Sequence, residues 1–311
     1  MKALDGITGS DYDALTKHMG APITLQLVRE KLPARPVDGH KGTFGHVFII
    51  AGSRGFTGAA KLAAEAASRS GVGLVTVGCP RSLADPMAVA LYEAMSRPLP
   101  ATPEETLSFA ALDPALSFAM DKQAVVLGPG ISQHEETRRF AIEFVRQCPA
   151  PMVVDADGLN CLSTAPDAFA CTNAPILITP HPGEMARLAQ CTTAEVQADR
   201  EGVAKRMAQR LGCVVALKGH RTVIADPNGN CLVNPTGNAG LGSGGTGDVL
   251  AGLLGGLLAQ GISTYDAALI GVYAHGLAAD IAVKSTTQRG LIARDVTHAL
   301  PMAWHFLERE A

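Results

Sequence analysis

The sequence predicts an α/β fold in which helices cover both faces of a central, mostly parallel sheet. Short apolar runs recur along the chain, and most are separated by stretches long enough for a helix. These runs show little alternation of polar and apolar residues, as expected for strands that are buried on both faces. The residues that close each run are rich in glycine and polar side chains, and open parallel sheets bind ligands at that edge.

The first β-α unit of this sheet begins at His46. Residues 46–51 form a continuous apolar run that Gly52 closes, and the alanine-rich segment 59–70 has the composition of a helix. The same pattern predicts five further buried strands. They are expected at residues 74–77, 124–127, 152–154, 176–178 and 214–217.

The last third of the chain departs from this pattern. Residues 222–225 and 231–233 flank a turn sequence, Asp226 to Asn230, which predicts an antiparallel hairpin at one edge of the sheet. After Gly247 the pattern is nearly all helical. The most apolar segment, 249–258, is too short to span a bilayer and is expected to be a buried helix.

The N-terminal region shows no strong periodicity up to about residue 40, which indicates an irregular lead-in or docking arm. We expect residues 1–22 to form an irregular extension and residues 23–311 to form a single domain. The first five residues lack the apolar core of a secretory signal, so a cytoplasmic protein is expected.

Composition excludes several classes of protein. Hydrophobic residues make up 47% of the 311 residues, enough for a substantial buried core. The formal charge of -3 arises from 26 basic and 29 acidic residues with no basic run, so no nucleic-acid partner is expected, and no membrane partner either. Seven scattered cysteines without a C-x-x-C pair indicate reduced thiols rather than disulfides or a zinc site.

The glycine-rich stretch from Asn234 to Asp248 is the most informative part of the sequence for function. Six glycines precede a predicted helix, and their unshielded N–H groups can form a cradle for phosphate or another oxyanion. A turn that only packs a helix against a sheet has little need of so many glycines, because each raises the entropy cost of ordering. Asp248 stands beside this cradle, which indicates phosphoryl transfer with Asp248 as the base.

Five other strand ends are glycine-rich or polar, and three of them carry ionisable candidate residues. Asp155 and Asp157 leave one buried strand and suit either a helix cap or a water-mediated Mg²⁺ site, with the cap favoured for Asp157. His181 stands between two prolines beside Glu184, which suits either a metal-bound water or a helix cap. Lys218 is a charge at a strand end that can hold a phosphate.

Together these motifs resemble the ADP-dependent NAD(P)H-hydrate dehydratase family over roughly residues 23–309. The resemblance rests on several motifs in consistent order rather than on any single one. They are Lys41-Gly42-Thr43-Phe44-Gly45, Ala51-Gly52-Ser53, Gly58-Ala59-Ala60, Gly128-Pro129-Gly130, Asp155-Ala156-Asp157, Thr179-Pro180-His181-Pro182-Gly183-Glu184, Lys218-Gly219, Asn234-Pro235-Thr236-Gly237-Asn238 and Gly244-Gly245-Thr246-Gly247-Asp248.

The resemblance implies a ribokinase-like three-layer α/β/α sandwich and a set of site residues. The implied anion hole and catalytic group are Gly245, Thr246, Gly247 and Asp248. The implied contacts with hydrated NADH or NADPH are Ala60, Gly130, His181 and Asp248, and those with the adenine nucleotide are Lys218, Gly219, His220, Arg221, Thr222 and Gly247. Asp155 and Glu184 are the expected Mg²⁺ groups, through water.

The implied reaction dehydrates the S-epimer of hydrated NADH or NADPH, with ADP or ATP as phosphoryl donor. Many family members also carry an epimerase domain, for which the N-terminal lead-in is too short, so a separate epimerase is an expected partner. A homo-oligomer, such as a tetramer, is also implied. The alternatives are a kinase of a hydroxymethyl or hydroxyethyl vitamin precursor and a nucleotide-binding sensor without turnover. His181 stands where such kinases often have asparagine, which weakens the kinase reading.

Overall fold

The computed structural model describes residues 20–309, in which nine strands form one sheet. The spatial order of the strands is β3-β2-β1-β4-β5-β6-β7-β8-β9, parallel from β3 to β7 and antiparallel thereafter. The strands are β1 (His46–Ile50), β2 (Leu74–Pro80), β3 (Met95–Leu99), β4 (Ala124–Leu127), β5 (Met152–Val154), β6 (Ile176–Ile178), β7 (Val214–Leu217), β8 (Val223–Ala225) and β9 (Cys231–Val233).

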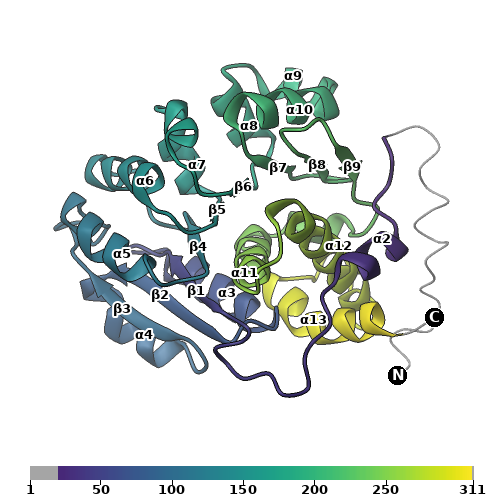
Figure 1. Ribbon diagram of the computed structural model, residues 1–311, viewed down its shortest axis with the longest axis horizontal. Coiled ribbons are helices and arrows are strands. Elements are labelled where there is room, and N and C mark those ends of the chain that lie inside the picture. Colours follow the sequence, from purple (N-terminus) through teal and green to yellow (C-terminus); the bar gives the residue numbers. More distant parts are fainter. Residues whose placement is uncertain (1–19, 310–311) are drawn as a thin grey trace.

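Helices cover both faces of this sheet, as Figure 1 shows. One layer contains α5 (Leu112–Ala119), α6 (Glu135–Gln147), α7 (Asp157–Leu162), α8 (Pro182–Ala189), α9 (Thr193–Ala198) and α10 (Arg200–Leu211). The other contains α2 (Leu25–Lys31), α3 (Thr57–Ser68), α4 (Ala84–Ala90), α11 (Thr246–Ala259), α12 (Thr264–Ala282) and α13 (Ala293–Glu308). The expected three-layer sandwich and its antiparallel edge hairpin, β8–β9, are confirmed.

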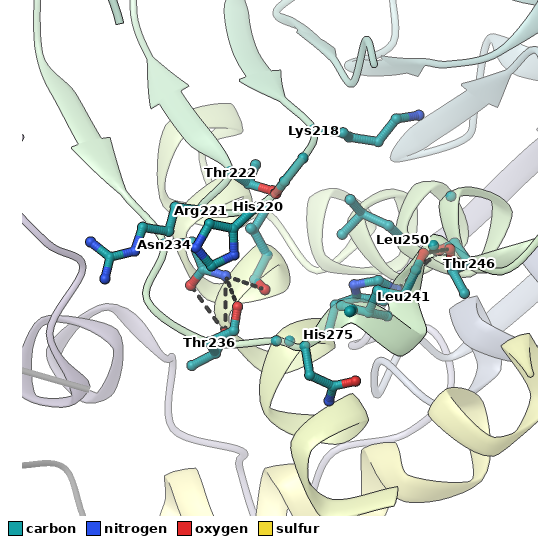
Figure 2. Close-up of a pocket in the computed structure, with 18 of the residues that line it drawn as sticks. Lys218, His220, Arg221, Thr222, Asn234, Thr236, Leu241, Thr246, Leu250 and His275 are labelled. Carbon is teal, nitrogen blue, oxygen red and sulfur yellow. Dashed lines mark hydrogen bonds between the residues drawn. The ribbon is translucent and has the colours of Figure 1, made fainter. Parts of the chain in front are cut away.

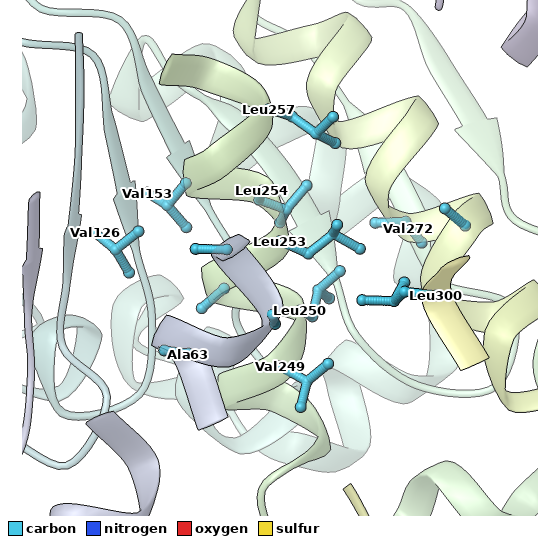
Figure 3. Close-up of a cluster of buried hydrophobic side chains, with 14 of the residues drawn as sticks. Ala63, Val126, Val153, Val249, Leu250, Leu253, Leu254, Leu257, Val272 and Leu300 are labelled. Carbon is cyan, nitrogen blue, oxygen red and sulfur yellow. The ribbon is translucent and has the colours of Figure 1, made fainter. Parts of the chain in front are cut away.

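Each face of the sheet has its own hydrophobic core, because neighbouring residues of a strand point to opposite faces. In β1, Val47 and Ile49 pack under α3 and α11, whereas Phe48 and Ile50 pack toward the α5–α10 layer. Figure 3 shows α11 lying between α3 and α12, with leucines such as Leu253 filling the space between the helices. Helix α11 is buried along most of its length, as the sequence predicts for segment 249–258.

Two elements were not anticipated from the sequence. Helix α2 interrupts the N-terminal stretch expected to be irregular, and it is short because only Val28 is fully buried. Strand β3 contains Arg97 and Pro98 and lies at the edge of the sheet, where a proline is tolerated and no apolar run is required. Most of the irregular extension expected at residues 1–22 lies outside the described residues.

The order of the strands places a topological switch point between β1 and β4. The chain runs from β1 outward through β2 and β3, and then returns to β4 on the other side of β1. The loops after β1 and β4 are joined there: the Gly52 amide donates to the Pro129 carbonyl (2.8 Å), and Ser53 Oγ donates to the Gly130 carbonyl (2.8 Å). Ligand crevices in open α/β sheets form at such points.

Candidate active site

Asp248 lies in the first turn of α11, directly after the glycine-rich stretch. Burial raises the pKa of its carboxyl to about 6, the nearby Asp155 charge adds to that rise, and Lys218 opposes it. Gly245, the residue before α11, has a φ of 90°, and a Cβ there would stand 2.6 Å from Leu62 Cδ1. Glycine is therefore required where the loop turns into the helix.

A buried ion pair lies beside this helix start. Lys218 Nζ donates to Asp155 Oδ1 at 2.5 Å and lies 3.9 Å from Glu184 Oε2. A Cβ placed on Gly247 would stand 3.4 Å from Lys218 Nζ and 3.8 Å from Asp155 Oδ2, so the cradle and the ion pair adjoin. Although burial lowers the pKa of Lys218, the carboxylates of Asp155, Glu184 and Asp248 outweigh it, and the net shift is upward. Lys218 therefore carries a full charge toward the cradle.

His181 and Glu184 cap helix α8 reciprocally. The amides of Gly183 and Glu184 donate to His181 Nδ1 (3.0 and 3.4 Å), while the His181 amide donates to Glu184 Oε2 (2.8 Å). Because Nδ1 accepts, the neutral ring carries its proton on Nε2. Burial lowers the pKa of His181, and Lys218 and Arg187 lower it further. Glu184 thus has the helix-capping role, and the ring of His181 remains 51% exposed.

Asp155 and Glu184, the two carboxylates expected to bind Mg²⁺, both face the Lys218 ammonium and do not form a cluster of metal ligands. The residues from 20 to 309 contain no group of three metal-ligating side chains. Asp155 is already paired with Lys218, and burial raises the pKa of Glu184 to about 7. This donor set suits Mg²⁺ held through water and phosphate oxygens better than direct coordination by protein.

Asp157 does not have the capping role that was favoured for it. It is the first residue of α7, whose amides receive no side-chain cap. Its carboxylate instead accepts from the Ser132 amide (3.0 Å) and from Gln133 Nε2 (3.1 Å), in the segment that follows the β4 loop. The expectation was wrong because the nearest unpaired donors belong to a neighbouring strand end, which sequence spacing does not show.

A cavity of about 440 Å³ lies on one side of the α11 start. Figure 2 shows that its walls come from the β7–β8 turn, the segment after β9, and helices α11 and α12. The six residues expected to hold the adenine nucleotide all contribute to it. These lining residues are Lys218, Gly219, His220, Arg221, Thr222 and Gly247.

The expected dinucleotide contacts lie outside this cavity. Asp248, Gly252 and Gly255 share one face of α11 because they are four and three residues apart. A Cβ on Gly255 would meet Val126 of β4 and Val47 of β1, so that face points to the switch point, where Gly130 lies. Ala60 has no exposed surface and packs against Gly52, so its contact with a ligand remains a prediction.

Some residues that shape the site were not anticipated. Arg200 begins α10, and its guanidinium donates to the carbonyls of Leu217 (2.9 Å), Lys218 (3.2 Å) and His220 (2.5 Å). A cation at a helix N-terminus opposes the helix dipole, which is the sequence signal that could have revealed it. Burial lowers the pKa of His275 to about 4, and its Nε2–H donates to the Thr246 carbonyl (3.0 Å). The Thr246 hydroxyl itself donates to the Leu241 carbonyl (2.7 Å).

Comparison with known proteins identifies the family. The sequence model described as NAD(P)H-hydrate dehydratase matches residues 47–302. An ADP-dependent (S)-NAD(P)H-hydrate dehydratase from Neisseria meningitidis is 39% identical over 86% of this chain and 87% of its own length. A bifunctional NAD(P)H-hydrate repair enzyme from Moorella thermoacetica is 42% identical over 93% of this chain, which spans only 54% of that relative.

The structure is similar to known members as well. The ADP/ATP-dependent NAD(P)H-hydrate dehydratase of Bacillus subtilis, crystallised with ATP and Mg²⁺, superposes with a TM-score of 0.81. It is 33% identical, and the match covers 94% of this chain and all of that one. The expected ribokinase-like fold is confirmed. The chain belongs to the NAD(P)H-hydrate dehydratase family.

Proposed function

We propose that the protein dehydrates the S-epimer of hydrated NADH and NADPH, using ADP or ATP as the phosphoryl donor. The observation that carries the proposal is the position of Asp248. Its face of α11 points to the switch point, while Thr246 and Gly247 line a nucleotide-sized cavity on the other side. A base between the two binding regions can deprotonate a hydroxyl as that hydroxyl attacks a phosphate.

The residues of the site support the phosphoryl-transfer step of this reaction. The Asp248 carboxylate takes the ring hydroxyl proton as the oxygen bonds to the terminal phosphorus and the bond to the nucleotide breaks. Lys218 and the amides around Gly247 stabilise the charge on the transferring group. Bound Mg²⁺ would supply further positive charge there, and Asp155 and Glu184 would hold it through water.

Phosphorylation turns a poor leaving group into a good one. The electron pair of the ring nitrogen then expels the phosphate, and loss of a proton from the neighbouring carbon restores the ring double bond. With ADP, the products are NADH, AMP and phosphate. His181, whose pKa burial lowers, and Glu184, whose pKa burial raises to about 7, provide polar groups at the same edge.

The test is to incubate the protein with hydrated NADH, Mg²⁺ and ADP, and to follow the returning absorbance of the dihydronicotinamide. We expect recovery that stops with the R-epimer unconverted, because the S-epimer is the proposed substrate. No recovery with ADP or ATP would overturn the proposal. Light scattering in the same buffer tests the expected homo-oligomer, such as a tetramer.

For the described residues, no helix is long and apolar enough to cross a membrane. All seven cysteines lie within that part of the chain and are unpaired. We retain a cytoplasmic location as a proposal that fractionation of cells would test.

A further inference from the structure

His275 is a polar side chain in a buried, mostly apolar stretch of α12. Only 7% of its surface is exposed, and its neighbours Ala274, Gly276 and Leu277 are buried and carry no polar side-chain group. A polar side chain is costly to bury unless it is hydrogen-bonded, so packing alone would favour an apolar residue here. What favours a histidine at this position is therefore the group that its ring binds.

The His275 ring is bonded to the carbonyl of Thr246, the first residue of α11. The distance from Nε2 to that oxygen is 3.0 Å. Because a carbonyl oxygen only accepts, the proton of the neutral ring is on Nε2. Burial and the nearby charge of Lys218 lower the pKa of His275 to about 4, so at neutral pH the ring makes this bond without adding a charge.

The bonded carbonyl belongs to the peptide whose N–H is that of Gly247. A peptide is planar, so its C=O and N–H point in opposite directions, and a bond that fixes one also fixes the other. Thr246 stands between two glycines, which have no Cβ to restrict the backbone. Its hydroxyl donates to the Leu241 carbonyl (2.7 Å), which holds the residue from the loop side. His275 holds the peptide itself, from the side of α12.

The Gly247 amide lies in the first turn of α11, where a helix leaves N–H groups for a ligand. The Val249 amide donates to the Gly245 carbonyl (3.1 Å), so the amides before Val249 have no partner within α11. A Cβ on Gly247 would stand 3.4 Å from Lys218 Nζ, so this amide adjoins the charge expected to hold the phosphate. Figure 2 shows His275 and Thr246 on the same side of the cavity, which Gly247 also lines.

We propose that His275 is a positioning residue for the anion hole, an inference that rests on the proposed function. Its Nε2–H holds the Thr246–Gly247 peptide so that the Gly247 N–H points at the transferring phosphoryl group. The same bond polarises the peptide and strengthens its N–H as a donor. A donor fixed in advance stabilises charge as it develops, so His275 acts on the rate of transfer and little on the binding of the nucleotide.

The test separates kcat from KM in variants of His275. His275→Leu removes the donor and should lower kcat with hydrated NADH and ADP on the order of tenfold, while KM for ADP changes by less than about twofold. His275→Gln should recover most of kcat, because its amide nitrogen is as many bonds from Cα as Nε2 is. His275→Asn, whose amide nitrogen is one bond closer to Cα, should not recover it.

His305→Leu is the matched control, since His305 is an exposed histidine on α13. It should behave as the unchanged protein. An unchanged kcat in His275→Leu, or an equal loss in His275→Gln when circular dichroism shows both folded, would overturn the inference. If His275→Leu does not fold, the comparison of His275→Gln with His275→Asn makes the same test. Activity of the unchanged protein in this assay separates these outcomes from a failure of the proposed function.

Discussion

At the scale of single residues, Asp248 owes its proposed chemistry to its surroundings. A carboxyl with an ordinary pKa is a weak base, whereas burial and the Asp155 charge raise the pKa of Asp248 to about 6. That value lies close to neutral pH, where a general base is most effective. Lys218 limits the rise, and through Asp155 and Glu184 it is held near Gly247.

Asp248→Asn should therefore fold normally and lose at least about 100-fold in kcat, because the amide keeps the shape and removes the base. The recovery assay with hydrated NADH measures the loss, and circular dichroism checks the fold. Asp113→Asn is the control, as Asp113 is an exposed acidic residue in the first turn of α5. Turnover near that of the unchanged protein would contradict the assignment of Asp248.

The pH dependence follows from the same shift. Asp248 must be ionised to act as the base, so kcat/KM should fall as the pH drops through about 6. Burial raises the pKa of Glu184 to about 7, and above that pH both carboxyls are ionised and kcat/KM should be level. Glu184→Gln should retain the limb near pH 6, which belongs to Asp248. A profile that stays flat from pH 8 to pH 5 would argue against a carboxylate base.

At the scale of elements, the cavity proposed to bind the nucleotide depends on how α10 meets the β7–β8 turn. The Arg200 guanidinium donates to three carbonyls between Leu217, the last residue of β7, and His220 in that turn. A Cβ on Gly219 (φ 142°) would stand 2.9 Å from Arg200 Nη2. The guanidinium thus fixes the carbonyls of the segment that carries Lys218. We interpret Arg200 as a residue that positions the nucleotide loop.

Arg200→Ala should raise KM for ADP on the order of tenfold with a smaller change in kcat, since hydrogen bonds to a charged group contribute roughly 1.5–3 kcal/mol. Arg200→Lys should recover only part of the loss, because lysine lacks the planar fork. Arg206→Ala, two turns along α10 and exposed, serves as control. Steady-state kinetics over a range of ADP concentrations gives both constants, and an unchanged KM would exclude the positioning role.

At the scale of the whole molecule, close packing of α11 against α3 holds the site together. A Cβ on Gly252 would stand 1.9 Å from the Ala63 carbonyl oxygen, and one on Gly256 would stand 2.0 Å from Ser70 Oγ. These glycines let the helix axes approach closely, and Figure 3 shows Ala63 of α3 beside α11. The approach aligns the two helix starts at the switch point, where the proposed substrate lies.

Gly252→Ala should lower the free energy of unfolding by about 1–3 kcal/mol, because the neighbouring atom is backbone and cannot rotate away. Gly58→Ala is the matched change, since Gly58 is also helical but faces open space. It should raise the same free energy by about 0.5–1 kcal/mol. Denaturant unfolding followed by circular dichroism measures both, and equal effects would contradict the packing argument.

Much of the fold was predictable from the sequence because buried parallel strands have a strong local signal. The bounds of β4, β5, β6 and β7 match the predicted apolar runs, and β1 differs by one residue. Strand β3 and helix α2 were missed because an edge strand and a short surface helix bury too few side chains to impose a pattern. The positions of Lys218 and Gly247 in the cavity wall were predictable for the same local reason, because Lys218 directly follows β7 and Gly247 lies in the first turn of α11.

What the sequence determined by itself was the set of strand ends, the glycine cradle and the family to which they belong. The tertiary structure alone decided which of those groups meet. It paired Lys218 with Asp155, which lies 63 residues away, turned the Asp157 carboxylate toward Ser132, and brought Arg200 onto the β7–β8 turn. Such contacts depend on strand order and helix packing, which place residues distant in the chain side by side and leave no periodic trace in the sequence.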